Sequence, residues 1–153
     1  MKILIRKFQK ADAKSLEKLD KIWKNEGISL GMDPRKAKDF IRKQKNEICF
    51  VAECNNKIVG YVCGKKSVYN KKKKLFFLKK GEKWLNFDSL YVLKSYRKLK
   101  IGRKLAFALI KEAKKEDLDS IILVADSKEQ EKLVSFYKKC GFDVILTRLK
   151  LKL

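Results

Sequence analysis

A nearly continuous apolar run, SIILVA at Ser120–Ala125, lies between two amphipathic helical patterns. A strand that is apolar at successive positions is typical of a sheet covered on both faces, because neither set of its side chains meets water. The helices on either side of the run connect it to neighbouring strands, and such parallel crossovers are right-handed. This feature therefore favours an α/β fold built on a mixed sheet.

Periodic patterns extend this prediction along the whole chain. The expected order is strand, two helices, three strands, helix, strand, helix, strand, with strands at residues 2–8, 48–54, 58–67, 84–92, 120–125 and 142–149. The second helix is expected to begin with Asp33 as its cap and Pro34 at its first position. Because no repeat or linker interrupts the pattern, we expect one domain over residues 1–153.

The chain carries a formal net charge of +22, from 40 basic and 18 acidic side chains. Such a field attracts nucleic acid, phosphorylated cofactors, acidic proteins and anionic lipid heads. A general lysine bias explains the charge as well, since the lysines are spread along the chain. Four consecutive lysines, Lys71–Lys74, lie in a basic excursion at residues 65–83, which is either a solvated hairpin tip or a docking surface for an anionic partner.

The chain has four cysteines and no histidine. Cys49, Cys54, Cys63 and Cys140 form no CxxC pair, so we expect buried free thiols in a reducing compartment and no metal site. The absence of histidine excludes Ser-His and Cys-His mechanisms. No apolar run approaches the roughly 20 residues of a membrane span, and the first apolar run is too short for a secretory signal. We therefore expect a cytoplasmic protein without a membrane partner.

The stretch YRKLKIGRKL, at Tyr96–Leu105, lies between a strand that ends near Val92 and a helix that begins near Ile101. The first amides of a helix lack intrahelical acceptors, and the helix dipole adds positive potential, so this is a candidate anion site. Further charge comes from Arg97, Lys98, Lys100, Arg103 and Lys104. A pyrophosphate would fit here, although these residues alone do not select the ligand.

In this context the chain resembles the GNAT superfamily of acetyl-CoA-dependent N-acetyltransferases. The stretches that carry the resemblance are IRKFQKADAKSLEKL, FVAECNNKIVGYV, LYVLKSYRKLKIGRKL and FYKKCGF, which occur in the family's order over nearly the whole chain. The resemblance implies a single α/β domain whose mixed sheet of six to seven strands is flanked by four helices. It also implies acetyl-CoA as the acetyl donor and no metal.

The resemblance assigns cofactor-binding positions residue by residue. The strand would offer backbone groups to the pantetheine arm from Leu90, Tyr91 and Val92, and the loop amides that would wrap the pyrophosphate belong to Lys98, Leu99, Lys100, Ile101, Gly102 and Arg103. Lys100 replaces the first glycine of the family's loop, and either adds a charge contact or crowds the ligand. Gln130 replaces an asparagine seven residues before a tyrosine, and keeps an amide that can contact the cofactor arm.

Two residues are candidates for the proton transfers of the reaction. Tyr137 would stand near the thioester sulfur and, with an ordinary pKa of about 10, act as the acid; otherwise it is a core aromatic. Asp88 lies four residues before Val92, where the family often places a carboxylate facing the acceptor. It is either the base, through a water chain, or an ordinary exposed strand residue. Glu53 and Glu82 are weaker candidates for the base.

The expected reaction moves the acetyl group to a primary amine, on a small molecule or a protein N-terminus, by direct attack on the thioester. The positive field argues against polyamine, aminoglycoside or basic-tail acceptors. The alternative is a basic RNA- or ribosome-associated protein on a degenerate acetyltransferase scaffold, with Tyr69, Phe76 and Phe77 available to stack bases. A nucleic-acid partner is thus open but not favoured. The single strand after Gly141 leaves a sheet edge that a homodimer would cover.

Overall fold

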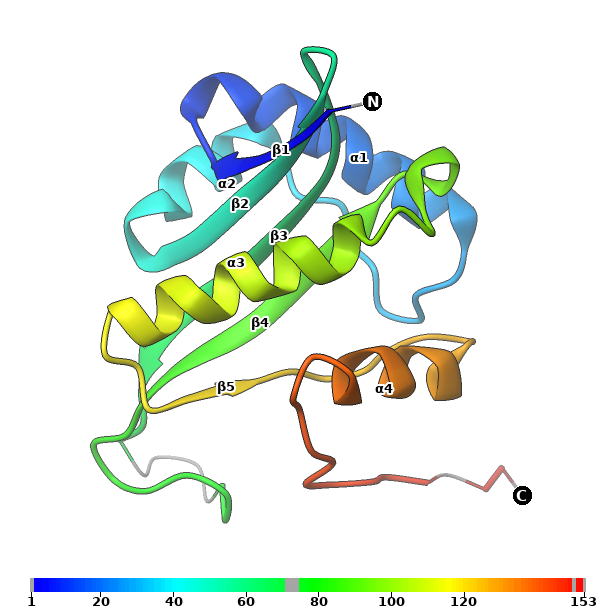
Figure 1. Cartoon of the computed structure of the whole chain (residues 1–153). Helices are drawn as coiled ribbons and strands as arrows, with labels where there is room; N and C mark the ends of the chain where they lie inside the picture. Colours follow the sequence, from blue (N-terminus) through cyan, green and yellow to red (C-terminus); the bar gives the residue numbers. More distant parts are fainter. Residues whose placement is uncertain (1, 71–74, 150, 153) are drawn as a thin grey trace.

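The computed structural model describes residues 2–70, 75–149 and 151–152. Within these residues the sheet has five strands, in the order β1-β2-β3-β4-β5 (Figure 1). The strands are β1 (Ile3–Lys7), β2 (Glu47–Cys54), β3 (Lys57–Val68), β4 (Lys83–Val92) and β5 (Ser120–Ile122). The first four pair antiparallel, and β4 pairs parallel with β5. The mixed α/β sheet predicted from the apolar run is confirmed.

The described residues include four α-helices that flank the sheet, as expected. They are α1 (Ala13–Glu26), α2 (Ala37–Lys43), α3 (Ile101–Lys115) and α4 (Gln130–Lys138), with short 3₁₀ turns η1 (Lys10–Asp12), η2 (Gln44–Asn46) and η3 (Lys94–Tyr96). The α1 and α2 helices lie on one face of the sheet, whereas α3 lies on the other (Figure 1). Side chains of α4 join the cluster beneath α3.

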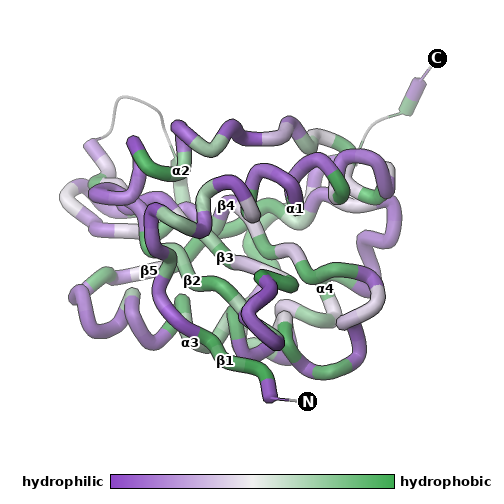
Figure 2. The backbone as a smooth tube through the Cα atoms, turned by 90° about the horizontal axis from the view of Figure 1, so that it is seen from above, coloured by the Kyte–Doolittle hydropathy of each residue, from purple (hydrophilic) through white to green (hydrophobic). Residues whose placement is uncertain are grey.

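The core consists of two apolar layers, one on each face of the sheet (Figure 2). The layer beneath α3 holds Leu85 of β4 and Leu105 of α3, both fully buried. The layer beneath α1 and α2 holds Leu16 and Tyr61, which are also fully buried. Because β3 supplies residues to both layers, as a central strand must, the sheet is fixed from both sides.

The β2–β3 hairpin turns where the NNK stretch predicts it. Asn55 and Asn56 both adopt left-handed backbone angles, with φ of 48° and 59°. Two consecutive positive φ values are the requirement of a two-residue hairpin turn, and asparagine tolerates them better than most residues.

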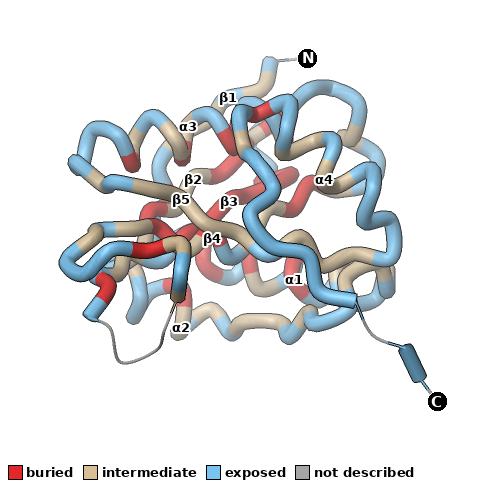
Figure 3. The backbone as a smooth tube through the Cα atoms, turned by 90° about the horizontal axis from the view of Figure 1, so that it is seen from below, coloured by how far each residue is buried: buried red, intermediate tan, exposed pale blue. Residues whose placement is uncertain are grey.

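The expected last strand, at residues 142–149, is wrong, and so is a sheet of six to seven strands. No strand is found in the described residues after β5. This segment runs extended with Val144, Ile145 and Leu146 all more than half exposed (Figure 3). An alternating pattern forms a strand only beside a partner that accepts its ladder of hydrogen bonds, and β5 pairs over three residues alone.

The second helix also begins later than predicted. Asp33 is an exposed residue outside the helix, and α2 starts at Ala37. The reason is that α1 supplies the carboxylates that the start of α2 needs: Glu17 accepts from the backbone N–H of Ala37 at 2.8 Å, and Asp20 accepts from that of Arg35 at 2.9 Å. Residues 27–36 therefore form a long irregular connection.

The expectation of four free thiols is corrected for one pair. Cys49 and Cys63 stand opposite each other on β2 and β3 and form a disulfide. Directly opposed side chains of antiparallel strands lie close together, which brings the two sulfurs within bonding range. Cys54 and Cys140 are free and buried, as predicted.

The basic excursion at residues 65–83 is described only in part, because Lys71–Lys74 lie outside the described residues. After that gap, Leu78 is buried whereas Phe76 is 78% exposed. The excursion is closed by backbone hydrogen bonds from Tyr69 to Glu82 and from Gly81 to Tyr69, both 2.9 Å. In the part of the chain that the structure describes, no helix is long and apolar enough to cross a membrane.

Candidate active site

Strand β4 and the edge strand β5 separate at the end where β4 leads into the basic loop. Their pairing covers three positions and ends at Asn86 opposite Ile122. On its other side, β4 remains paired with β3 as far as Val92 opposite Gly60. The described backbone of β4 beyond Asn86, including Leu90, Tyr91 and Val92, therefore has no β5 partner, and its edge is open to an extended ligand arm.

The loop that follows β4 has the backbone of an anion-binding turn. Lys98 and Lys100 both have positive φ, of 69° and 59°. The first helical hydrogen bond runs from the N–H of Lys104 to the carbonyl of Lys100 at 3.1 Å. The amides of Ile101, Gly102 and Arg103 precede this bond and therefore have no intrahelical acceptor.

The space around Gly102 is large enough for a side-chain Cβ atom. A Cβ atom built at this position would lie 3.6 Å from Cζ of Phe136 and 3.9 Å from Cγ2 of Val92, which are ordinary contacts. A glycine in the first turn of a helix is costly relative to alanine, so its use here is consistent with a ligand that approaches the backbone closely.

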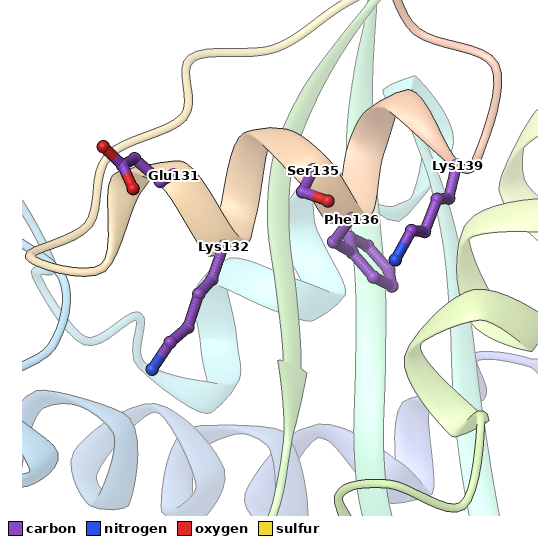
Figure 4. A pocket seen from close by; sticks show the side chains of 5 residues that line it. All are labelled: Glu131, Lys132, Ser135, Phe136 and Lys139. Carbon is purple, nitrogen blue, oxygen red and sulfur yellow. The ribbon is translucent and has the colours of Figure 1, made fainter.

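A shallow hollow of about 460 Å³ lies against α4 beside this turn. Lys132, Phe136 and Lys139 extend into it from one side of the helix (Figure 4). Gln130 borders a second hollow on the same helix, which it shares with Lys138. The α4 helix thus brings the Phe136 ring to the start of α3, next to Gly102.

Tyr137 packs into an aromatic cluster on the α3 side of the sheet. Its ring meets the ring of Phe87 edge-on, with centroids 5.6 Å apart, and the ring of Phe142 at 5.7 Å. Burial, and to a lesser extent the neighbouring Cys140, raises the pKa of the Tyr137 hydroxyl above its ordinary value. The hydroxyl is therefore a proton donor throughout the neutral range.

Asp88 lies at an irregularity of β4, where the register with β3 shifts between Cys63 and Gly64. Its side chain is exposed and accepts a hydrogen bond from the Asn86 amide. Although the residue is exposed, neighbouring groups partly bury its carboxyl, and this loss of hydration raises the pKa of the Asp88 carboxyl. The nearby Glu47 carboxylate raises that pKa further, whereas Arg35 opposes the shift. A raised pKa makes a carboxylate a better proton acceptor.

Tyr137 and Asp88 stand on opposite faces of β4. Phe87, the residue before Asp88, faces Tyr137 in the α3 layer, whereas Asp88 interacts with Arg35 and Glu47 near α2. The structure therefore places the candidate acid and the candidate base on either side of the strand that leads to the opening. The weaker candidates have structural partners: Glu53 binds Arg6, and Glu82 accepts from Ser120.

A polar cluster that the sequence did not single out links α1 to the loop between β4 and α3. Glu26, the last residue of α1, accepts hydrogen bonds from the Tyr91 hydroxyl at 2.7 Å and from the Arg97 guanidinium at 2.5 Å. Arg97 also donates to the backbone carbonyl of Val92 at 2.9 Å, and Trp23 stacks on Tyr91. Arg97 was visible in the basic stretch, but nothing in the sequence pointed to Glu26.

The remaining loop residues divide between core and surface. Ile101 is buried and anchors the start of α3, whereas Leu99 is 42% exposed. Arg103 lies over the ring of Phe107, at 5.3 Å from its centroid. The loop, the open edge of β4 and the face of α4 thus lie together at one end of the sheet.

Comparison with known families identifies this arrangement. Residues 14–142 match the sequence profile of the acetyltransferase (GNAT) family, from α1 through the loop and α4. The chain belongs to the GNAT acetyltransferase family. The resemblance to this family is thereby confirmed.

Solved structures of the same fold include several acetyltransferases. A predicted acetyltransferase from Clostridium acetobutylicum, crystallised with acetyl-CoA, is 24% identical, with a TM-score of 0.73 over 99% of this chain and 96% of its own. A ribosomal-protein-alanine N-acetyltransferase from Brucella melitensis is 16% identical, with a TM-score of 0.73 over 100% of both chains. Glucosamine-6-phosphate N-acetyltransferase from Arabidopsis thaliana is 18% identical, with a TM-score of 0.72 over 99% of both. No curated protein sequence matches the chain.

Proposed function

We propose that this GNAT protein transfers the acetyl group of acetyl-CoA to a primary amine, on a small molecule or a protein N-terminus, by direct attack in the cytoplasm. The observation that carries the proposal is the coincidence, at one end of the sheet, of an open β4 edge and unpaired amides in the loop that follows it. An extended arm that ends in a pyrophosphate matches this pair of features.

The residues present fit acetyl-CoA. The open edge of β4, with Leu90, Tyr91 and Val92, suits hydrogen bonding to an amide-containing arm in the manner of an added strand. The amides of Lys98 through Arg103 and the helix dipole suit a pyrophosphate. Gly102 leaves the space that close approach to the backbone requires. The bound molecule would supply an acetyl thioester, which amines attack readily.

Tyr137 and Asp88 would handle the two protons of the reaction. The Tyr137 hydroxyl, kept protonated by its raised pKa, would donate a proton to the leaving sulfur. Asp88, on the opposite face, would accept the proton that the ammonium of the acceptor must lose. The placement on opposite faces suits an amine that enters from the α1–α2 side and a thioester held on the α4 side.

An acetylation assay tests this proposal. Release of free thiol from acetyl-CoA is measured with a panel of amines: glucosamine 6-phosphate, a peptide with an N-terminal alanine, and spermidine. We expect turnover with at least one of the first two. Slow turnover with spermidine follows from the long-range repulsion of a polycation by a chain of net charge +22. Fast acetylation of spermidine would contradict that expectation.

A further inference from the structure

Two loops that are far apart in the sequence are joined by one carboxylate. Asp126, in the connection between β5 and α4, accepts a hydrogen bond from the N–H of Leu30 at 2.9 Å and another from the N–H of Gly31 at 2.7 Å. A backbone bond from Lys128 to the carbonyl of Ile28, at 2.9 Å, runs beside them. The Ser29 hydroxyl also donates to Oδ2 of Asp126, at 3.4 Å. Four hydrogen bonds thus fix residues 28–31 of the α1–α2 connection to the β5–α4 connection.

The residues at this junction fit one another closely. Each carboxylate oxygen of Asp126 accepts from a different amide, which is the strong, charge-assisted kind of hydrogen bond. A Cβ on Gly31 would lie only 3.0 Å from Oδ2 of Asp126, so a larger residue would push the carboxylate away. Among the described residues no lysine or arginine forms a salt bridge with Asp126, although the chain carries 40 basic side chains.

The α1–α2 connection is also anchored at its other end, on the β4 side of the gap between β4 and β5. Glu26, immediately before it, binds Tyr91 of β4 and Arg97 of the loop. The segment between these anchors, residues 27–31, therefore runs from the β4 side to the β5–α4 side at the end where the two strands have separated (Figure 1). It follows α1, and so it belongs to the face opposite the aromatic cluster of Tyr137.

We propose that Asp126 is a positioning residue that holds residues 28–31 as the wall of the acceptor entrance. This inference rests on the acetyltransferase function proposed above. The wall carries Leu30, which is 70% exposed, and no positive charge between Glu26 and Asp33. An uncharged wall with an exposed leucine suits an amine flanked by an apolar group, such as an apolar N-terminal residue.

Releasing the wall should affect the acceptor and spare the cofactor. In Asp126→Ala the hydrogen bonds from residues 29, 30 and 31 to the carboxylate are lost, and in Gly31→Ala the new methyl group crowds Oδ2 of Asp126 and shifts it. In each variant we expect the KM for the most active amine of the panel to rise by about tenfold, because the ordered wall becomes a minor state. The dissociation constant for acetyl-CoA should change less than twofold.

Hydrogen exchange supplies a readout that does not depend on turnover. The amides of Leu30 and Gly31 should exchange faster in Asp126→Ala than in the wild type, because their acceptor is gone. Asp143→Ala, the same change at an exposed residue after α4, is the matched control. It should alter neither the exchange of these amides, nor the KM for the amine, nor the dissociation constant for acetyl-CoA.

The outcomes separate this inference from the function on which it rests. Unchanged amine KM in Asp126→Ala and Gly31→Ala, with an active wild type, overturns the positioning role alone. Weakened acetyl-CoA binding together with a raised amine KM also overturns it, because that result indicates general loss of structure. A wild type that neither binds acetyl-CoA nor acetylates any amine of the panel overturns both.

Discussion

Lys100 has a left-handed backbone conformation, which favours glycine, and it stands where the resemblance places the first glycine of the loop. Its φ of 59° lies in the left-handed region, where a side chain costs about 1 kcal/mol or more. A lysine at this position therefore stores strain in the loop that we propose binds the cofactor.

Replacing Lys100 by glycine should stabilise the protein. We expect Lys100→Gly to raise the free energy of unfolding by about 0.5–1 kcal/mol in urea titrations, since relief of the left-handed strain exceeds the added entropy of the unfolded chain. Lys100→Ala is the matched control: it removes the same charge but retains Cβ, and should give no gain. Equal gains in both variants would mean that charge, rather than backbone strain, is the cause.

Gly102 should show the opposite balance between stability and binding. Because a Cβ there meets only ordinary contacts, Gly102→Ala should stabilise α3 by about 1 kcal/mol. If the glycine serves ligand approach, the same change should weaken acetyl-CoA binding about tenfold, which corresponds to roughly 1.4 kcal/mol. Thermal unfolding and calorimetry on one preparation measure the two effects, and unchanged affinity would show that the cofactor does not come near this backbone.

At the scale of elements, α1 is tied to the sheet by a buried carboxylate. Asp20 is only 1% exposed; it accepts from the Tyr61 hydroxyl of β3 and from the Arg35 backbone. Burial raises the pKa of the Asp20 carboxyl above 3.8, and the hydrogen bonds from Tyr61 and Arg35 reduce the shift without cancelling it. Folding therefore makes protonation of Asp20 easier than it is in the unfolded chain.

This shift predicts how stability depends on pH. A raised folded-state pKa contributes stability that is fully present below the unfolded value and is lost as the pH rises through the folded value. Relative to Asp20→Asn, the wild type should therefore gain stability as the pH falls from 7 toward 4, in unfolding titrations at several pH values. Asp33→Asn, at an exposed carboxylate of the following connection, measures the ordinary effect of such a change. A wild type that loses stability relative to Asp20→Asn as the pH falls over this range would contradict the assignment.

The elements also show what the sequence could and could not predict. The β2–β3 hairpin and the loop before α3 carry local signals, namely turn residues and a glycine, and each was placed correctly. The apolar run at 120–125 was only partly right: it forms an edge strand over Ser120–Ile122 alone, none of whose residues is buried, and Val124 is 85% exposed. The strand at 142–149 failed because a strand requires a neighbour, which no local pattern reports. The start of α2 failed because its capping groups come from Glu17 and Asp20 of another helix.

The candidate site divides in the same way. Its loop residues, from Lys98 to Arg103, are contiguous and were recognised as a motif. Glu26 and Asp126 act through contacts with distant segments, and a single sequence offers no signal for such pairings. The same holds for Cys49 and Cys63, whose pairing depends on the register of two strands.

For the molecule as a whole, the charge of +22 and the family membership differ in how narrowly they define the ligand. A positive field assists any anionic ligand, whether acetyl-CoA or RNA. The open β4 edge and the loop amides, by contrast, are suited to one elongated anion. Binding of acetyl-CoA at this end, followed by acetyl transfer that depends on Tyr137, is thus the central claim.

The most direct test is calorimetry with acetyl-CoA on the wild type and on Tyr137→Phe, joined to an acetylation assay of both. We predict that both bind acetyl-CoA with similar affinity, and that turnover falls by about a hundredfold or more in Tyr137→Phe, because the proton donor is lost while the ring remains packed against Phe87. Absence of acetyl-CoA binding by the wild type, with a steeply salt-dependent affinity for RNA, would contradict the account and support the RNA-associated alternative.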